Sequence, residues 1–471
     1  MDIHIRLGGR GDLSVQIYRQ LLEAVLDGRL RPGERLPPTR ELASRLEVSR
    51  NTVGLAYELL AADGVLAGQV GSGSFVSRGP AHESRPRRAP SGAVDPRDVW
   101  RSLPPPITRS ARAPAYDFGV GVPDQQLFPR TQWRRLLANE FRSAPQGSYG
   151  HPGGHAAIRA AIARHIGLSR AVRAEADDVI VTQGAQQAFD VIGRVLISEG
   201  ACVAVEEPGY PLVQRLFRSL GARVVGVPVD DEGLVVDAIP SQSRLVYVTP
   251  SHQFPLGTVM SFQRRTALLA WAERRGGVVI EDDYDSEFRF DGRSLDSLQS
   301  LDRTGRVIYV GSFSKVLLPA LRIGFLIAPT SVQSALLTAK QLTDWHGDPA
   351  SQAALARFID EGLLARHIRK VRREYADRHA KIVESLERRF PSWLRLIPSA
   401  AGLHVAAGAV AGRRGDILRA VHRAQQRGVR VGVLSDYYLG TPARAGLVIG
   451  YGAIPASRID EGMKRLAASF A

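Results

Sequence analysis

The sequence has a single cysteine and no long apolar run. Cys202 alone cannot form an internal disulfide, which is typical of a protein that folds in a reducing compartment. No stretch of about 18 consecutive apolar residues occurs, so a membrane span is not expected. The first residues, MDIHIRLGGRGDLS, lack the apolar core of a secretory signal. We therefore expect a cytoplasmic protein without a membrane partner.

The charge balance is strongly basic, but it is unevenly distributed. The net charge of the 471 residues is +15, whereas residues 1–77 hold nine arginines and nine acidic residues. Residues 78–115 carry eight arginines against three acidic residues, and they are rich in proline and serine. Such a segment buries too little apolar surface to fold alone, so we interpret it as a linker. It separates a small domain, residues 1–77, from a large one, residues 116–471.

The N-terminal segment has the pattern of a winged helix-turn-helix, an α+β fold. Apolar residues recur at helical spacing in three short stretches, and two glycine-flanked extended pieces follow. The predicted elements are a helix capped by Ser14 and ended by Gly28, a second helix over residues 39–46, a third capped by Ser49, and extended pieces near residues 65–66 and 75–76.

This segment also resembles a known family. LPPTRELASRLEVSRNTVGLAYELLAADGVLAGQVGSGSFV is similar to the DNA-binding domain of the GntR family of bacterial regulators, over residues 12–77. The resemblance implies a recognition helix in the major groove and a wing at residues 68–73 near the minor groove. Arginine reads guanine and asparagine reads adenine at such a position. Many relatives carry an arginine where this chain has Gly54, so that contact is absent or supplied elsewhere. The residues implied to bind DNA are Thr39, Arg40, Ser49, Arg50, Asn51, Thr52 and Gly71.

The large segment alternates strand-like and helical patterns. Short β-rich runs are separated by helical stretches, which predicts an α/β domain with a mostly parallel sheet covered on both faces. A smaller C-terminal domain should follow it. The predicted strands cover residues 179–182, 201–208, 244–250, 277–284, 306–314 and 324–329.

One motif in this segment centres on a lysine. In GSFSKVLLPALRIG, Lys315 closely follows an apolar strand and lies among small residues, a setting that suits a Schiff-base lysine. The motif resembles the signature of fold-type I aminotransferases. That resemblance implies that Lys315 carries pyridoxal 5′-phosphate (PLP) as the catalytic group, with Ser312 and Arg322 on the phosphate.

A second motif, VVIEDDYDSEF, places carboxylates at the end of a strand. A carboxylate there can pair with the pyridine nitrogen of PLP. The resemblance implies Asp282 for this role and Tyr284 as the donor to the ring oxygen O3′. Enzymes of this fold space the two residues differently by one position, so Asp283 remains an alternative.

Three further positions complete the implied cofactor site. In VTQGAQQAFDVI, the backbone N–H groups of Ala185 and Gln186 begin a helix and can receive the phosphate. In EEPGYP, Tyr210 would stack on the cofactor ring. Tyr149 would reach the phosphate of a partner subunit, which implies a homodimer. We expect no metal site.

Together the two resemblances cover essentially the whole chain, which is identified as a member of the MocR/GabR class of regulators. The class implies a transcription regulator that binds operator DNA and senses PLP or an amino compound. Two departures from aminotransferases favour sensing over catalysis. Phe254 replaces the asparagine that contacts O3′, with His252 or Gln253 as substitutes, and Val448 stands where enzymes carry a substrate-binding arginine, with only Arg444 nearby.

Two alternatives remain open at this stage. The first is a catalytically active aminotransferase that carries a DNA-binding domain, and any transamination in the preferred interpretation is expected to be vestigial. The second is a regulator whose large domain has lost PLP, against which the presence of Lys315, Asp282 and Arg322 argues. An activator cannot be told from a repressor, and the operator and effector are not indicated.

Overall fold

The computed structural model consists of two compact units, Met1–Asp95 and Pro96–Ala471. It describes residues 5–8, 12–69, 73–77, 94–106, 114–143, 149–290, 296–399, 401–410 and 414–470. Among these described residues, none of the helices has both the length and the apolar character needed to cross a membrane.

The N-terminal unit is a three-helix fold with a hairpin. Its elements are α1 (Leu13–Leu26), α2 (Thr39–Arg45), α3 (Arg50–Ala62), β1 (Leu66–Gln69) and β2 (Gly73–Val76), the strands pairing antiparallel. Ile17, Leu21, Leu42, Val53 and Leu60 form its core. The winged helix-turn-helix is therefore present, and Gly71 at the expected wing tip lies outside the described residues.

The cap of the first helix differs from the prediction. The Asp12 side chain accepts a hydrogen bond from the Ser14 backbone N–H at 2.9 Å, so Asp12 is the N-cap and the helix begins two residues earlier than expected. The Ser14 hydroxyl also donates to Asp12 and is buried. By contrast, the Ser49 hydroxyl accepts from the Thr52 N–H at 3.1 Å and caps α3 as predicted.

The larger unit contains an eight-stranded sheet of order β4-β11-β10-β9-β8-β5-β6-β7. The strands from β10 through β9, β8 and β5 to β6 are parallel, whereas β11 and β7 run antiparallel to their neighbours. The strands are β4 (Val179–Thr182), β5 (Cys202–Glu207), β6 (Arg223–Asp230), β7 (Gly233–Leu234), β8 (Ser243–Val248), β9 (Val278–Asp283), β10 (Val307–Ser312) and β11 (Gly324–Ile327).

Both faces of this sheet are buried because side chains alternate along each strand. In β5, Val203 and Val205 pack towards Phe189 of α7, whereas Ala204 packs towards Trp271 of α9. The helices of this lobe are α4 (Asp98–Ser102), α5 (Arg130–Ser143), α6 (Ala156–Arg170), α7 (Ala185–Leu196), α8 (Pro211–Ser219), α9 (Phe262–Arg275), α10 (Leu298–Leu301), α11 (Thr330–Asp344) and α12 (Pro349–Asp360).

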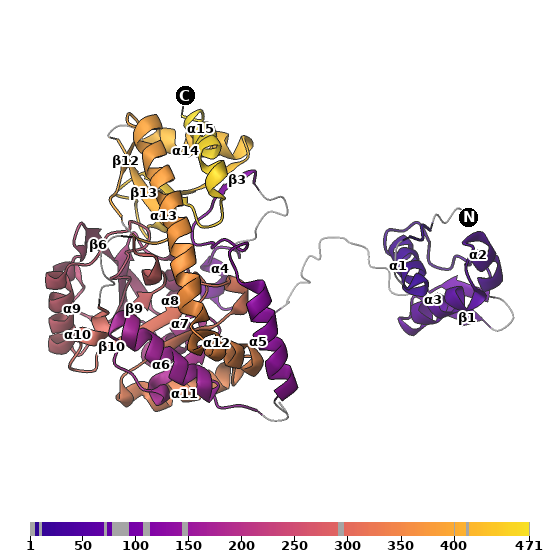
Figure 1. Ribbon diagram of the computed structural model, residues 1–471, viewed down its shortest axis with the longest axis horizontal. Helices are drawn as coiled ribbons and strands as arrows, with labels where there is room; N and C mark the ends of the chain where they lie inside the picture. The colour runs from indigo at the N-terminus through magenta and orange to yellow at the C-terminus, as the bar shows by residue number, and fades with distance from the viewer. Residues whose placement is uncertain are drawn as a thin grey trace. The chain divides into compact units, whose positions relative to one another are not determined.

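A second lobe contains a five-stranded sheet of order β12-β13-β15-β14-β3. Figure 1 shows the long helix α13 (Leu363–Arg389) running from the helices beside the large sheet up to this C-terminal lobe. Its other elements are β3 (Tyr116–Phe118), β12 (Leu394–Leu396), β13 (His404–Ala409), β14 (Val429–Val433), β15 (Gly446–Gly450), α14 (Arg414–Gln426) and α15 (Ala456–Ala467). The expected large and small domains of an α/β body are thus both present.

Candidate functional site

Strand register gathers the predicted site residues at one edge of the large sheet. Ser312 ends β10 and pairs with Gly324 of β11, which in turn pairs with Thr182 at the end of β4. The parallel strand β9 ends at Asp283, level with Gly311. Ligands of α/β folds bind at this carboxyl edge, so the register brings distant motifs to one place.

The start of helix α7 forms a cradle with Arg322. Gly184 precedes the helix at a φ of +75°, and a Cβ there would lie 3.0 Å from the Arg322 guanidinium. Arg322 donates a hydrogen bond to the Gln183 carbonyl oxygen, which fixes its position over the turn. Among the residues that the structure describes, no side chain caps the helix, so the first N–H groups, those of Ala185 and Gln186, remain available to an anion.

Asp282 lies at the same edge and has one unused oxygen. Its Oδ2 accepts a hydrogen bond from the Tyr247 hydroxyl at 2.5 Å, whereas its buried Oδ1 has no partner among the described residues. Burial raises the pKa of Asp282 to about 7, an effect that the Tyr247 hydrogen bond opposes. A cationic or hydrogen-bonding ligand atom would satisfy this oxygen.

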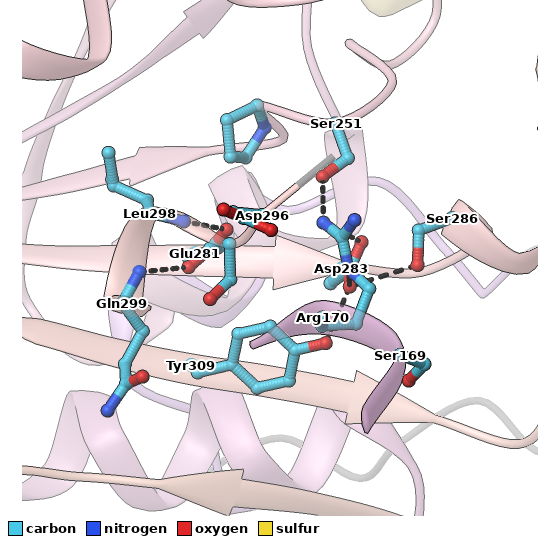
Figure 2. Close-up of polar contacts among 12 residues, drawn as sticks. Ser169, Arg170, Ser251, Glu281, Asp283, Ser286, Asp296, Leu298, Gln299 and Tyr309 are labelled. Atoms are coloured by element: carbon cyan, nitrogen blue, oxygen red, sulfur yellow. Dashed lines mark hydrogen bonds and ion pairs between the residues drawn. The ribbon is translucent and has the colours of Figure 1, made fainter. Parts of the chain in front are cut away.

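The neighbouring Asp283 is committed to a buried ion pair. Its Oδ2 lies 2.7 Å from Arg170 Nε and accepts from the Tyr309 hydroxyl at 2.5 Å and the Ser286 hydroxyl at 3.0 Å, as Figure 2 shows. Arg170 also contacts the Ser251 hydroxyl. Successive strand residues point to opposite faces, which separates the two carboxylates. The geometry therefore favours Asp282 over Asp283 as the group that faces a ligand.

Loss of Arg170 should destabilise the larger unit strongly. Arg170 and Asp283 are 4% and 2% exposed, so Arg170→Ala leaves a buried carboxylate without its cation. We expect a loss of about 3–5 kcal/mol in the free energy of unfolding, measured with urea. Arg164 on the same helix pairs with Asp360 at the surface, and Arg164→Ala should cost no more than about 1 kcal/mol. Equal effects of the two changes would contradict this account.

Lys315 and Tyr210 complete the central part of the site. Lys315 Nζ donates a hydrogen bond to the Gly121 carbonyl oxygen at 2.7 Å. Burial raises the pKa of Tyr210 to about 12; the charge of Asp282 adds to this and that of Arg322 opposes it. Tyr210 is thus close enough to feel both the carboxylate and the guanidinium. Lys315, Tyr210, Asp282 and Arg322 thus lie near one another in the structure.

Two predicted site residues lie differently. The Tyr284 hydroxyl is 2.9 Å from Nδ1 of His252, so the two side chains are hydrogen-bonded to each other. Tyr149 is 78% exposed and stacks on Trp345 with ring centroids 4.9 Å apart. Within one chain, Tyr149 therefore contacts Trp345 and His346 rather than the cofactor residues.

The two positions at which a substrate anchor is expected to be replaced are occupied by apolar side chains. Phe254 packs edge-on against the rings of Tyr210, Tyr284, Tyr437 and His404. The Gln253 amide donates to Glu206, Pro208 and Phe254, so it is not available as a substitute for the missing asparagine. Val448 is fully buried with Val229, Leu256 and Leu434, and Arg444 is exposed.

Sequence reasoning named His252 but missed several other polar residues of the site. Tyr247 lies in β8, where successive side chains point to opposite faces of the sheet. A lone tyrosine in a largely apolar strand could have identified it as a site residue. Glu206 is buried with an unpartnered Oε1, and burial raises its pKa to about 7. His252, Asp285 and His404 each bring one potential metal-ligand atom within 4.8 Å of the others, although both nitrogens of His252 are hydrogen-bonded to protein.

The N-terminal unit presents the DNA-binding candidates on one connected surface of α2 and α3. Arg40, Ser49, Arg50 and Asn51 are exposed, and Thr39 and Thr52 are half-buried. Among the described residues, Arg50 forms no ion pair with an acidic side chain. The start of α3 therefore offers free donors together with the positive end of the helix.

Comparison with known proteins agrees with both halves of this description. Residues 13–76 match the model of bacterial regulatory proteins of the gntR family, and residues 115–411 match aminotransferase class I and II. The probable rhizopine catabolism regulatory protein MocR of Rhizobium meliloti is 37% identical, over 97% of this chain and 93% of its own. The pyridoxine biosynthesis regulator PdxR of Corynebacterium glutamicum is 34% identical, over 96% and 95%.

Solved structures show the same fold for the larger unit. Kynurenine aminotransferase of Pyrococcus horikoshii superposes with a TM-score of 0.71 at 27% identity, covering 79% of this chain and 98% of the enzyme. The α-aminoadipate aminotransferase LysN of Thermus thermophilus, complexed with N-(5′-phosphopyridoxyl)-L-leucine, gives 0.69 at 30% identity, covering 75% and 91%. Such a domain implies PLP as the cofactor, and the unpaired Asp282 oxygen and the cradle at Gly184 fit it. The chain belongs to the MocR-type transcription regulators, in which a GntR-family DNA-binding domain is joined to an aminotransferase class I and II domain.

Proposed function

We propose that PLP, alone or with an amino compound, binds in the larger unit and sets the affinity of a cytoplasmic homodimer for its operator. One observation carries this proposal: the groups suited to hold PLP are kept, while those that anchor an amino-acid substrate are not. Asp282 Oδ1 is unpartnered and Arg322 covers the start of α7, but Phe254 and Val448 replace the polar anchors. The relative named as a regulator of pyridoxine biosynthesis supports PLP as a ligand.

We propose the following roles for the residues of the site. Lys315 forms the covalent bond, Asp282 pairs with the pyridine nitrogen, Tyr284 donates to O3′ and Tyr210 stacks on the ring. Ser312, Arg322 and the N–H groups of Ala185 and Gln186 hold the phosphate. When bound, PLP supplies a carbonyl carbon that bonds to an amine and a ring that withdraws electrons.

The homodimer is supported by an exposed aromatic surface. Tyr149 and Trp345 stack on each other yet are 78% and 40% exposed, and Leu342 beside them is 83% exposed. Large apolar side chains gathered at a surface are typical of an interface. A second copy of the chain would cover them, and Tyr149 would then reach the partner's phosphate site.

Contacts to DNA are assigned to α2 and α3 of each N-terminal unit. Arg50 and Asn51 lie in the first turn of α3, where side chains reach base edges. Thr39 and Arg40 open α2 and are assigned to phosphate or bases, Ser49 and Thr52 belong to the start of α3, and Gly71 is assigned to the wing.

Replacing Arg50 should reduce both affinity and sequence preference. If Arg50 reads a base, Arg50→Ala should cost about 1–3 kcal/mol in operator binding and little in binding to random DNA. The operator is the DNA that the wild-type protein selects from a random pool, and binding is measured at fixed salt. Arg19 is also exposed but lies on α1, so Arg19→Ala is the matched control. An equal loss of affinity for operator and random DNA would show that Arg50 contacts phosphate rather than a base.

The second candidate function is a working aminotransferase with a DNA-binding domain. It is favoured by the similarity of the larger unit to aminotransferases, up to 30% identity among those described above, and by the retained Lys315. Sustained formation of a 2-oxo product would support it. The same measurement is used against the regulator hypothesis at the end of the Discussion.

A further inference from the structure

A buried histidine connects Tyr284 to the C-terminal lobe. His252 is 1% exposed, and its Nδ1 lies 2.9 Å from the Tyr284 hydroxyl and 3.0 Å from Asp285 Oδ2. Its Nε2 lies 3.0 Å from the hydroxyl of Ser399, in the segment between β12 and β13. Every polar atom of this imidazole is therefore engaged, although neither family model assigns it a role.

The carboxylate determines how the hydrogens are arranged. A carboxylate only accepts hydrogen bonds, so Nδ1 must carry the hydrogen that faces Asp285. Nδ1 then has no lone pair for Tyr284, so the Tyr284 oxygen, 2.9 Å away, can only be a second acceptor that shares this hydrogen with the carboxylate. The hydroxyl hydrogen of Tyr284 is left to point away from His252, towards another acceptor.

Tight packing keeps the imidazole in this orientation. A Cβ on Gly402 would lie 2.1 Å from Cε1 of His252 and 2.6 Å from Asp285 Oδ2, so only glycine fits there. A Cβ on Gly257 would lie 3.2 Å from Nε2. The ring cannot turn without displacing backbone, which makes the donated hydrogen bond a fixed feature of the site.

The charged and titratable groups that face Tyr284 and His252 come from several elements. The ring of His404 is 5.1 Å from that of His252, and its Nε2 is bonded to the Pro255 carbonyl oxygen. Burial and the charge of Asp285 raise the pKa of Tyr284 well above its usual value, so it stays a hydrogen donor. The charged and titratable groups that face Tyr284 and His252 are Asp282, Asp285, Glu206, His404, Tyr451 and Lys315.

Resting on the PLP binding proposed above, we propose that His252 and Asp285 form a positioning pair. The pair donates a hydrogen bond to the Tyr284 oxygen and so directs the Tyr284 hydroxyl towards O3′ of the cofactor. A phenol that accepts one hydrogen bond is a stronger donor of the next. The pair therefore takes over part of the role of the missing asparagine without touching the cofactor.

The pH dependence of the bound cofactor's visible absorbance tests this proposal in the full chain. A hydrogen bond to O3′ stabilises negative charge there, so its loss lets the chromophore hold its proton to higher pH. Tyr284→Phe should raise the midpoint by about one pH unit, and His252→Phe by about half a unit or more. His252→Asn keeps an N–H donor near the position of Nδ1 and should stay near the wild-type midpoint.

The outcomes separate this proposal from the one on which it rests. A wild-type protein without any cofactor absorbance would overturn PLP binding itself. A His252→Phe variant that binds cofactor with the wild-type midpoint, while Tyr284→Phe is shifted, would overturn the positioning role alone. If His252→Phe does not fold, Asp285→Leu serves instead, because it removes both oxygens that can accept the Nδ1 hydrogen and orient the ring. An upward shift supports the pair, and an unchanged midpoint contradicts it.

Discussion

Replacing Lys315 with alanine should abolish the covalently held cofactor. Purified wild-type protein should show an absorbance band that neither free lysine nor cofactor-free protein has, and borohydride should trap the cofactor on the chain. Lys315 is the amine at the carboxyl edge of the sheet close to Asp282, since its positive charge acts on that carboxyl group. Lys315→Ala should therefore leave no trapped adduct by mass spectrometry.

A matched change shows that the loss belongs to this position. Lys381 lies on α13 and pairs with Asp377 at the surface, so Lys381→Ala should keep the full adduct. PLP should still bind Lys315→Ala non-covalently, because Arg322 and Asp282 remain, although more weakly. A borohydride-stable adduct that persists in Lys315→Ala would show that another amine carries the cofactor.

The features predictable from sequence were those encoded locally. Ser49 and the helix after it were recognisable because capping and helical periodicity act within a few residues. The strands, which are short apolar runs in the sequence, and the turn at Gly184 were recognisable for the same reason. The prediction of the cap of α1 was wrong because Asp12 and Ser14 can both cap a helix within one turn. The geometry of the chain that enters the helix decides between them.

What the sequence could not give depends on contacts between distant segments. Asp282 and Asp283 are adjacent and chemically alike, and only the pairing of Asp283 with Arg170, 113 residues away, separates their roles. The contact of His252 with Ser399 spans 147 residues and depends on how the two lobes meet. Nothing in the local pattern reveals such pairs, since they form only after the sheets have assembled.

Binding of ligand should change operator affinity, because Lys315 is linked to both lobes. It lies just beyond β10 of the large sheet, and its Nζ bonds to Gly121, which follows β3 of the smaller sheet. β3 is also the first strand after residues 78–115, the segment that leads from the N-terminal unit. A ligand that takes Lys315 away from Gly121 would thus act on the part of the body joined to the DNA-binding unit.

The size of this effect is set by the coupling free energy. A ligand changes DNA affinity only if it favours one arrangement of the protein over another, and such couplings are typically about 1–3 kcal/mol. We therefore expect PLP, or an amine with PLP, to change operator affinity by about 5–150-fold. Arg322→Ala should reduce the response by weakening PLP binding, whereas DNA binding without ligand should stay unchanged.

The most direct test measures operator binding and 2-oxo product on the same sample, with and without PLP and candidate amines. A regulator that uses its aminotransferase-like domain as a sensor should show the change in operator affinity, with product limited to about one equivalent per site. Sustained turnover with an unchanged affinity for the operator would contradict this account and support the enzyme.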